Sequence, residues 1–207
     1  MLIGYAKQPV IWQGAKPHGP MPVGLTGYGP DGKATHPVGK LGCVPSATAM
    51  ALRLLGAKAG ATVVEVMEAA KRARDKVYPD PERPASAVVP ELVRAQKGLI
   101  VGEDVPGAGV LVPPGPDVLR PLLLQCFARG GVALVCVDYD RDLPAGDPTG
   151  EHWCCARGVE PFGRLYLADP ATAKDESVDL ATLSGPVHWG SVVRPYVVVR
   201  VVTVYRG

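Results

Sequence analysis

The hydrophobic positions along the chain follow a helical period in the first half and a strand-like pattern in the second. The clearest helical stretch begins at Cys43, and Gly56 supplies a stop signal after it. Its apolar residues recur at i, i+3, i+4 and i+7, namely Ala47, Met50, Ala51 and Leu54. This spacing predicts a buried helix that starts at Cys43.

Three further helices are predicted downstream. Thr62 and Glu65 have the spacing of a capping box, which opens a helix that ends in the basic residues 71–74. A short helix is expected over 90–96. The apolar side of residues 117–128 predicts a fourth helix, which the glycine pair 130–131 ends.

The remainder of the chain has the character of β-strands. Residues 132–138 form a compact apolar run, and residues 152–159 and 164–169 are spaced as a hairpin. The end of the chain, residues 191–205, adds two strand candidates on either side of Pro195. Helices followed by an antiparallel sheet predict an α+β fold, with one layer of helices packed on that sheet.

The first forty residues differ from the rest, since glycine and proline interrupt every periodic pattern there. The 207 residues contain 25 glycines and 22 prolines, yet the 47% apolar content is too high for general disorder. We therefore expect a Gly/Pro-rich arm or long loop over 1–40 and one domain over 41–207.

The charge balance is nearly even, with 22 Lys and Arg against 20 Asp and Glu. This argues against a nucleic-acid binder, and no apolar run is long enough for a membrane span. Five cysteines without CxxC pairs indicate reduced thiols and no metal or cofactor. No signal peptide is visible, so we expect a cytoplasmic protein, or one exported without a signal as in a phage particle.

Candidate chemistry centres on Cys43, because a helix N-terminus favours a thiolate through its free N–H groups. Gly42 allows close backbone approach, and Pro45 lies in the first turn, where a missing N–H costs nothing. His152, at the start of a predicted strand, is positioned to accept the proton. Asp169, which ends the neighbouring strand, is positioned to orient the imidazole.

These segments resemble the papain-like cysteine peptidases, and among them the double-glycine leader peptidases of bacteriocin exporters and their stand-alone bacterial relatives. The resemblance lies in Gly42–Met50, in Gly150–Trp153 and in Leu165–Pro170. It implies a papain-like fold in which Cys43 is the nucleophile, His152 the general base and acid, and Asp169 the residue that orients the imidazole. The segment at Cys43 also resembles streptopain, but the Asn-Trp pair of that branch is missing.

Two positions depart from the family pattern. Val44 stands where the family has glycine directly after the nucleophile, and residues 37–41 lack the glutamine that supplies a side chain to the oxyanion hole. Gln13 and Gln8 are the glutamines farther upstream, and the resemblance assigns that role to Gln13, with the Cys43 backbone N–H as the second donor.

The other thiols and histidines have plainer interpretations. Cys126 and Cys136 lie in apolar runs and are assigned to the core, and Cys154 and Cys155 are assigned to packing. His188 is the rival base, but no strand ending in an acid follows it.

The sequence thus predicts a thiol hydrolase that cleaves a peptide or isopeptide bond through a Cys43 acyl-enzyme, with a peptide, protein or cell-wall peptide as substrate. The alternative is a catalytically silent papain-like structural or binding module, such as a component of a phage particle. In that case the arm and the C-terminal strands would contact assembly partners.

Overall fold

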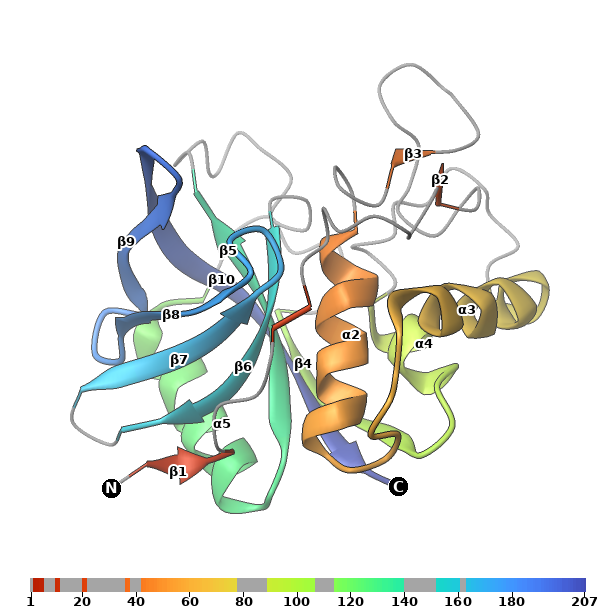
Figure 1. Cartoon of the computed structure of the whole chain (residues 1–207). Helices are drawn as coiled ribbons and strands as arrows, with labels where there is room; N and C mark the ends of the chain where they lie inside the picture. Colours follow the sequence, from red (N-terminus) through yellow and green to blue (C-terminus); the bar gives the residue numbers. More distant parts are fainter. Residues whose placement is uncertain are drawn as a thin grey trace.

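The computed structural model describes residues 2–5, 10–11, 20–21, 36–37, 42–77, 89–106, 114–139, 152–160 and 163–207, with the side chains of 20–21, 36–37, 70–71 and 73–77 left aside. The predicted boundary at residue 40 and the proposed oxyanion residue Gln13 lie outside these residues. Helices and strands are labelled in Figure 1.

Six antiparallel strands form a closed barrel (Figure 1). The ring closes because β6 pairs with β5 on one edge and with β7 on the other. Around the ring the order is β6, β5, β10, β9, β8, β7. The bounds are β5 Val132–Asp138, β6 His152–Val159, β7 Arg164–Asp169, β8 Lys174–Asp179, β9 Ser184–Trp189 and β10 Val192–Arg206.

The predicted fold class is therefore wrong: the chain is not a layer of helices on an open sheet but mostly a closed barrel. Strands β8 and β9 were not predicted. Their sequences, KDESVD and SGPVHW, lack the regular apolar alternation that marks a half-buried strand. They are nevertheless the strands that join β7 to β10 and complete the ring.

The C-terminal segment is also one long strand rather than two. Pro195 of β10 lies opposite Pro186 of β9, and β5 pairs with β10 only from Val197 onward. Two residues without an N–H fit a non-hydrogen-bonded pair, so Pro195 removes no hydrogen bond from the ladder. The strand therefore continues through the proline.

The predicted helices are confirmed in the described residues. They are α2 (Cys43–Leu54), α3 (Val63–Val77), α4 (Val89–Arg94) and α5 (Pro116–Ala128). Gly56, with φ of +65°, ends the first of them, and Gly130, with φ of +74°, follows the last. The capping box is present, since the Glu65 N–H donates to Thr62 Oγ1 at 3.3 Å and the Thr62 N–H donates to Glu65 Oε2 at 3.0 Å.

Three additional pairings extend the barrel or stand apart from it. β1 (Ile3–Gly4) pairs with β6, and β4 (Leu99–Val105) pairs with β10. β2 (Pro20–Met21) and β3 (His36–Pro37) form a separate two-stranded sheet. No helix in the described part of the chain is long and apolar enough to cross a membrane.

Two hydrophobic cores lie on opposite sides of the barrel wall. Along β5, Val132, Leu134 and Cys136 pack against the core formed with α2, α3 and α4, whereas Ala133, Val135 and Val137 belong to the barrel interior. Both faces of β5 are buried, which explains why its sequence is a continuous apolar run.

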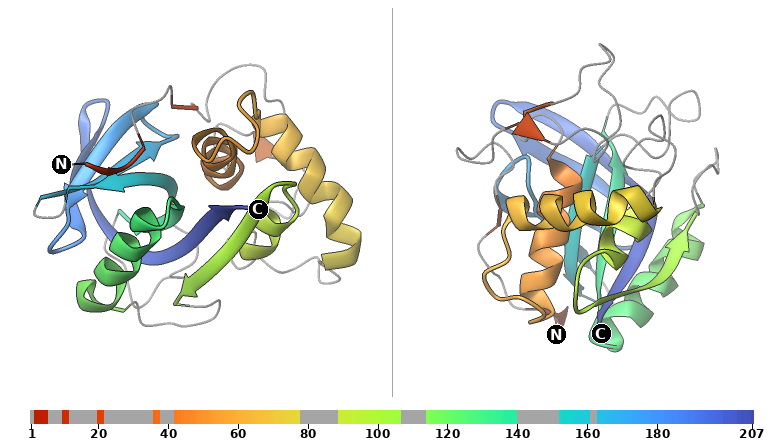
Figure 2. Two further views of the ribbon diagram at one scale, coloured as in Figure 1. Left: turned by 90° about the horizontal axis from the view of Figure 1, so that it is seen from below. Right: turned by 90° about the vertical axis from the view of Figure 1, so that its right-hand side faces the viewer.

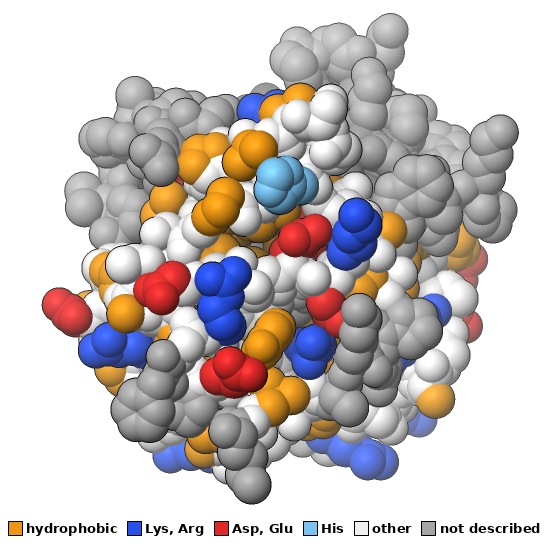
Figure 3. All heavy atoms as spheres, turned by 60° about the vertical axis from the view of Figure 1, so that its left-hand side comes forward, with side chains coloured by type: hydrophobic (Ala, Val, Ile, Leu, Met, Phe, Trp, Pro, Cys, Tyr) orange, Lys and Arg blue, Asp and Glu red, His pale blue; other side chains and the backbone are white. Residues whose placement is uncertain are grey.

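The helices occupy different sides of the barrel (Figure 2). α2, α3 and α4 lie together on one flank, and α5 packs its Leu119, Leu123 and Phe127 against the barrel interior from the lower end of Figure 1. The other flank, shown in Figure 3, carries acidic and basic side chains close together, with hydrophobic ones gathered above them. Both α2 and β6 begin at the upper end of the barrel (Figure 1).

Candidate functional site

The structure brings Cys43, His152 and Asp169 to the same end of the barrel. Cys43 is the first residue of α2, His152 the first of β6 and Asp169 the last of β7. β6 and β7 are antiparallel neighbours, so the start of one strand meets the end of the other. The helix start contributes the thiol from outside the barrel wall.

Local sequence explains why α2 presents Cys43 at its first turn. Gly42 is the N-cap residue and has no side chain to bind the free N–H groups, and Pro45 has no N–H. The first-turn N–H groups of Cys43 and Val44 have no carbonyl to bind within the helix. Such groups favour negative charge on a thiolate or on an oxygen beside it.

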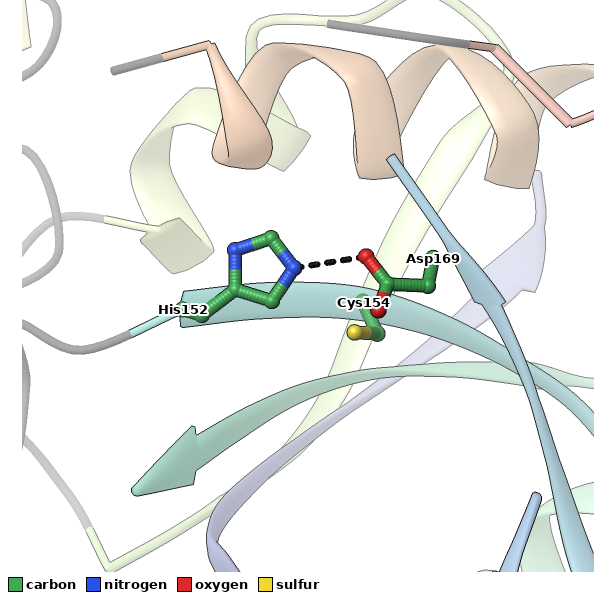
Figure 4. Close-up of side chains that lie close together, drawn as sticks. All are labelled: His152, Cys154 and Asp169. Atoms are coloured by element: carbon green, nitrogen blue, oxygen red, sulfur yellow. Dashed lines mark hydrogen bonds and ion pairs between the residues drawn. The ribbon is translucent and has the colours of Figure 1, made fainter. Parts of the chain in front are cut away.

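The imidazole of His152 is held by Asp169. His152 Nε2 lies 2.7 Å from Asp169 Oδ1, and both side chains are buried, with 3% and 0% of the residue surface exposed (Figure 4). When Nε2 carries the proton and donates to the carboxylate, Nδ1 has a free lone pair. Figure 4 shows that this second nitrogen points away from Asp169.

Cys43 is among the neighbours that raise the pKa of His152, so its thiol lies near the same imidazole. Because Nε2 is hydrogen-bonded to Asp169, Nδ1 is the ring nitrogen available to the thiol. Thiol, imidazole and carboxylate therefore lie in the order of a cysteine catalytic triad. In that order the imidazole can accept the proton of the thiol.

A further pair of residues supports Asp169, and sequence reasoning did not find them in this role. Tyr196 of β10 donates its hydroxyl to Asp169 Oδ2 at 2.6 Å, and Trp189 Nε1–H donates to the Tyr196 oxygen at 2.7 Å. The Ala171 N–H also donates to Asp169 Oδ1 at 2.7 Å. Pairing between β9 and β10 creates this network, and no local motif signals it.

The surroundings shift the pKa of both partners in the buried pair. Burial by itself would lower the pKa of His152, but the neighbouring Cys154, Asp169 and Cys43 outweigh it and hold the pKa well above its usual value. Burial would raise the pKa of Asp169, but hydrogen bonds from His152, Tyr196 and Ala171 keep it below its usual range. The pair therefore favours an imidazolium beside a carboxylate.

Cys43 differs from the other four thiols in its exposure. Cys43 is partly exposed, whereas the remaining cysteines are buried, as the sequence predicted for core and packing residues. Burial raises the pKa of Cys126 to about 11 and that of Cys154 to about 12, and it raises those of Cys136 and Cys155 further. These four thiols are neutral at physiological pH.

His152, Cys154 and Asp169 have metal-ligating atoms within 4.8 Å of one another. This donor set is of a kind that zinc accepts. However, Asp169 already accepts three hydrogen bonds, from His152, Ala171 and Tyr196. Both carboxylate oxygens of Asp169 therefore have hydrogen-bond partners.

Of the other residues singled out in the sequence, the structure describes His188 and Val44. Gln13 and the segment before His152, residues 150–151, are outside the described residues. His188, the rival base, is exposed on β9 and pairs in register with Val193. Val44 is buried in the first turn of α2, beside the thiol.

Neither models of protein families nor curated proteins match this chain. Function is therefore argued from the chemistry of the site, since a fold by itself does not specify an activity.

Proposed function

We propose that the protein is a thiol hydrolase that cleaves a peptide or isopeptide bond, with Cys43 as nucleophile, His152 as general base and acid, and Asp169 as the residue that orients the imidazole. One observation carries the proposal: a partly exposed thiol at a helix start lies near an imidazole whose Nε2 is 2.7 Å from a buried carboxylate.

The reaction would proceed in two halves. In the first half, Nδ1 of His152 holds the proton of the Cys43 thiol, so sulfur bonds to the carbonyl carbon as a thiolate, and the first-turn N–H groups of α2 stabilise the negative oxygen. The imidazolium then protonates the departing nitrogen as the C–N bond breaks. Water, deprotonated by the imidazole, attacks the thioester, releases the carboxylic acid and restores the thiol.

Asp169 would contribute by making the imidazole a stronger base at Nδ1. Its charge stabilises the imidazolium that forms during both halves, and its fixed position sets the tautomer. Tyr196 keeps the carboxylate ionised by donating to Oδ2. The resemblance of the three segments to cysteine peptidases supports the same roles, and it favours a peptide or cell-wall peptide as substrate.

The test is alkylation of the intact protein with iodoacetamide from pH 4 to pH 9, with each cysteine followed by mass spectrometry. Wild type is compared with His152→Ala and Asp169→Asn. We expect Cys43 to react at near-neutral pH, while the four buried thiols serve as internal references because burial keeps them neutral and shielded. The His152→Ala variant should lose the near-neutral reactivity of Cys43.

A protein that reacts in this way is then incubated with a peptide library, and a Cys43→Ala variant is the control for contaminating peptidases. If Cys43 is no faster than Cys126 or Cys136, or if His152→Ala leaves its pH profile unchanged, the thiolate–imidazole pair does not exist. The chain would then be a silent structural or binding module.

A further inference from the structure

Arg194 lies next to the proposed catalytic pair, and the proposed mechanism does not use it. The residue belongs to β10 and is two positions before Tyr196, so both side chains leave the same face of the strand. That face is the barrel interior, where the Tyr196 hydroxyl reaches Asp169. Arg194 is therefore directed toward the same end of the barrel as His152.

Two aromatic rings hold the guanidinium in place. Its central carbon lies 5.1 Å from the ring centroid of Tyr139 and 5.6 Å from that of Trp189. The Trp189 ring meets the His152 ring edge-on, with centroids 5.4 Å apart. Trp189 thus contacts both the guanidinium and the imidazole, and the two distances set an upper limit on their separation.

The Arg194 fork has a free donor. Its Nε atom is buried without a hydrogen-bond partner, and the side-chain interactions that the described residues make with Arg194 are the two ring contacts. A buried N–H of a charged group that lacks an acceptor is costly, so it calls for an acceptor from elsewhere. Nε and a neighbouring Nη form the side-on pair that binds a carboxylate with two parallel hydrogen bonds.

We propose that Arg194 forms a carboxylate subsite and that the substrate is an acidic peptide. This inference rests on the proposed function. The two ring distances limit the separation of guanidinium and imidazole to about three residues of extended chain, at roughly 3.3–3.6 Å per residue. The carboxylate therefore belongs within about four residues of the bond that Cys43 attacks, on an acidic side chain or at the chain end.

The test uses alkylating probes that report on the site without a known substrate. Bromoacetyl-(Gly)n with n from 1 to 4 is prepared as the free acid and as the amide, and rates of Cys43 alkylation are measured by mass spectrometry. Bromoacetyl-Glu-amide and bromoacetyl-Gln-amide form a second pair, which separates a side-chain carboxylate from a terminal one. The ratio of acid to amide rates is compared in wild type, Arg194→Gln, Arg194→Lys and the control Arg164→Gln.

Arg164 is a suitable control because its guanidinium already donates to Ser177 on an exposed part of β7. The imidazolium of His152 attracts anions in every variant, so its effect cancels in the comparison. We expect the acid-to-amide ratio to peak at one probe and to fall about tenfold in Arg194→Gln. Arg194→Lys should retain part of the ratio, and Arg164→Gln all of it.

Rates with the neutral amides show whether each variant keeps an intact site. Equal acid-to-amide ratios in wild type and Arg194→Gln, with Cys43 still reacting fast, would overturn the carboxylate subsite and leave the thiol hydrolase standing. A Cys43 that reacts no faster than Cys126 with any amide would overturn both proposals.

Discussion

The hydroxyl of Tyr196 gives the sharpest test of the network behind His152, through the substitution Tyr196→Phe. Tyr196 is fully buried, donates to Asp169 Oδ2 at 2.6 Å and accepts from Trp189 Nε1–H at 2.7 Å. A hydrogen bond to a charged group contributes about 1.5–3 kcal/mol, and an indole N–H left unpaired costs about 1 kcal/mol. We expect the free energy of unfolding to fall by about 2–4 kcal/mol.

The assay is urea and thermal unfolding of both proteins at pH 7, 5 and 3. A loss of this size corresponds to a fall in Tm of roughly 5–15 °C for a domain of 150–250 residues. The folded state holds the pKa of Asp169 below its usual value. The contribution of this carboxylate to folding stability is therefore complete above the unfolded pKa of about 3.9, and it is lost as the pH falls through the lower folded pKa. The difference between the proteins should therefore shrink at pH 3.

Tyr166→Phe is the matched control. Its hydroxyl donates to Glu160 Oε1 at 3.0 Å, but the ring is only partly buried and lies on the outside of the barrel wall. We expect a change of at most about 0.5 kcal/mol there. If Tyr196→Phe were as mild as this control, or if its effect were the same at every pH, the carboxylate would not depend on the tyrosine as argued.

Three further outcomes follow from the structure. Thr62→Ala should lower stability by about 1 kcal/mol in thermal unfolding, because its Oγ1 caps α3. Arg157→Met should lower the free energy of unfolding by about 3–5 kcal/mol in urea, because it removes the arginine that lies 2.9 Å from the buried Asp175 carboxylate. The double variant Arg157→Met with Asp175→Leu should recover most of that loss. NMR titration should show the His152 ring losing its proton well above pH 6.5, and Asp169→Asn should move the midpoint of that titration downward. The contribution of His152 to folding stability should be full below pH 6.5 and should be lost as the pH rises through the folded pKa. A midpoint unchanged by Asp169→Asn would contradict the pairing.

The elements that the sequence predicts are those whose signals are local. The i, i+3, i+4 spacing after Cys43 and the capping box at Thr62 lie within a few residues, and the helices begin where these signals place them. The continuous apolar run of β5 reflects burial on both faces, so its bounds are also readable. Each of these patterns depends on neighbours in the chain.

Closure of the barrel depends on pairings that no local pattern encodes. β8 carries Lys174, Asp175 and Glu176 and reads as a loop, yet its register with β7 is continuous over the whole strand. The strands that the sequence predicts form an open sheet whose edge is β7. The predicted layer of helices on a sheet failed for this reason, because β8 and β9 complete the ring.

Closure of the barrel also determines which site residues can be predicted from the sequence. Cys43, His152 and Asp169 each mark the end of a predictable element, so their meeting was inferred from the order of elements. Tyr196 and Trp189 reach the carboxylate only because β9 and β10 pair inside the closed ring. The support of the base is therefore a property of the fold rather than of a motif.

This arrangement assigns a different task to the C-terminal strands from the partner contacts considered on sequence grounds. β10 pairs with β9, β5 and β4 along its length. It carries Tyr196, which donates to the Asp169 carboxylate, and Arg194, which contacts Trp189. The Cys43 thiol comes from a helix outside the barrel, whereas His152, Asp169 and Arg194 all belong to strands of the barrel. Under the two proposals, a substrate held between them would contact α2 on one side and the end of the barrel on the other, so the last strand would contribute to recognition as well as to stability.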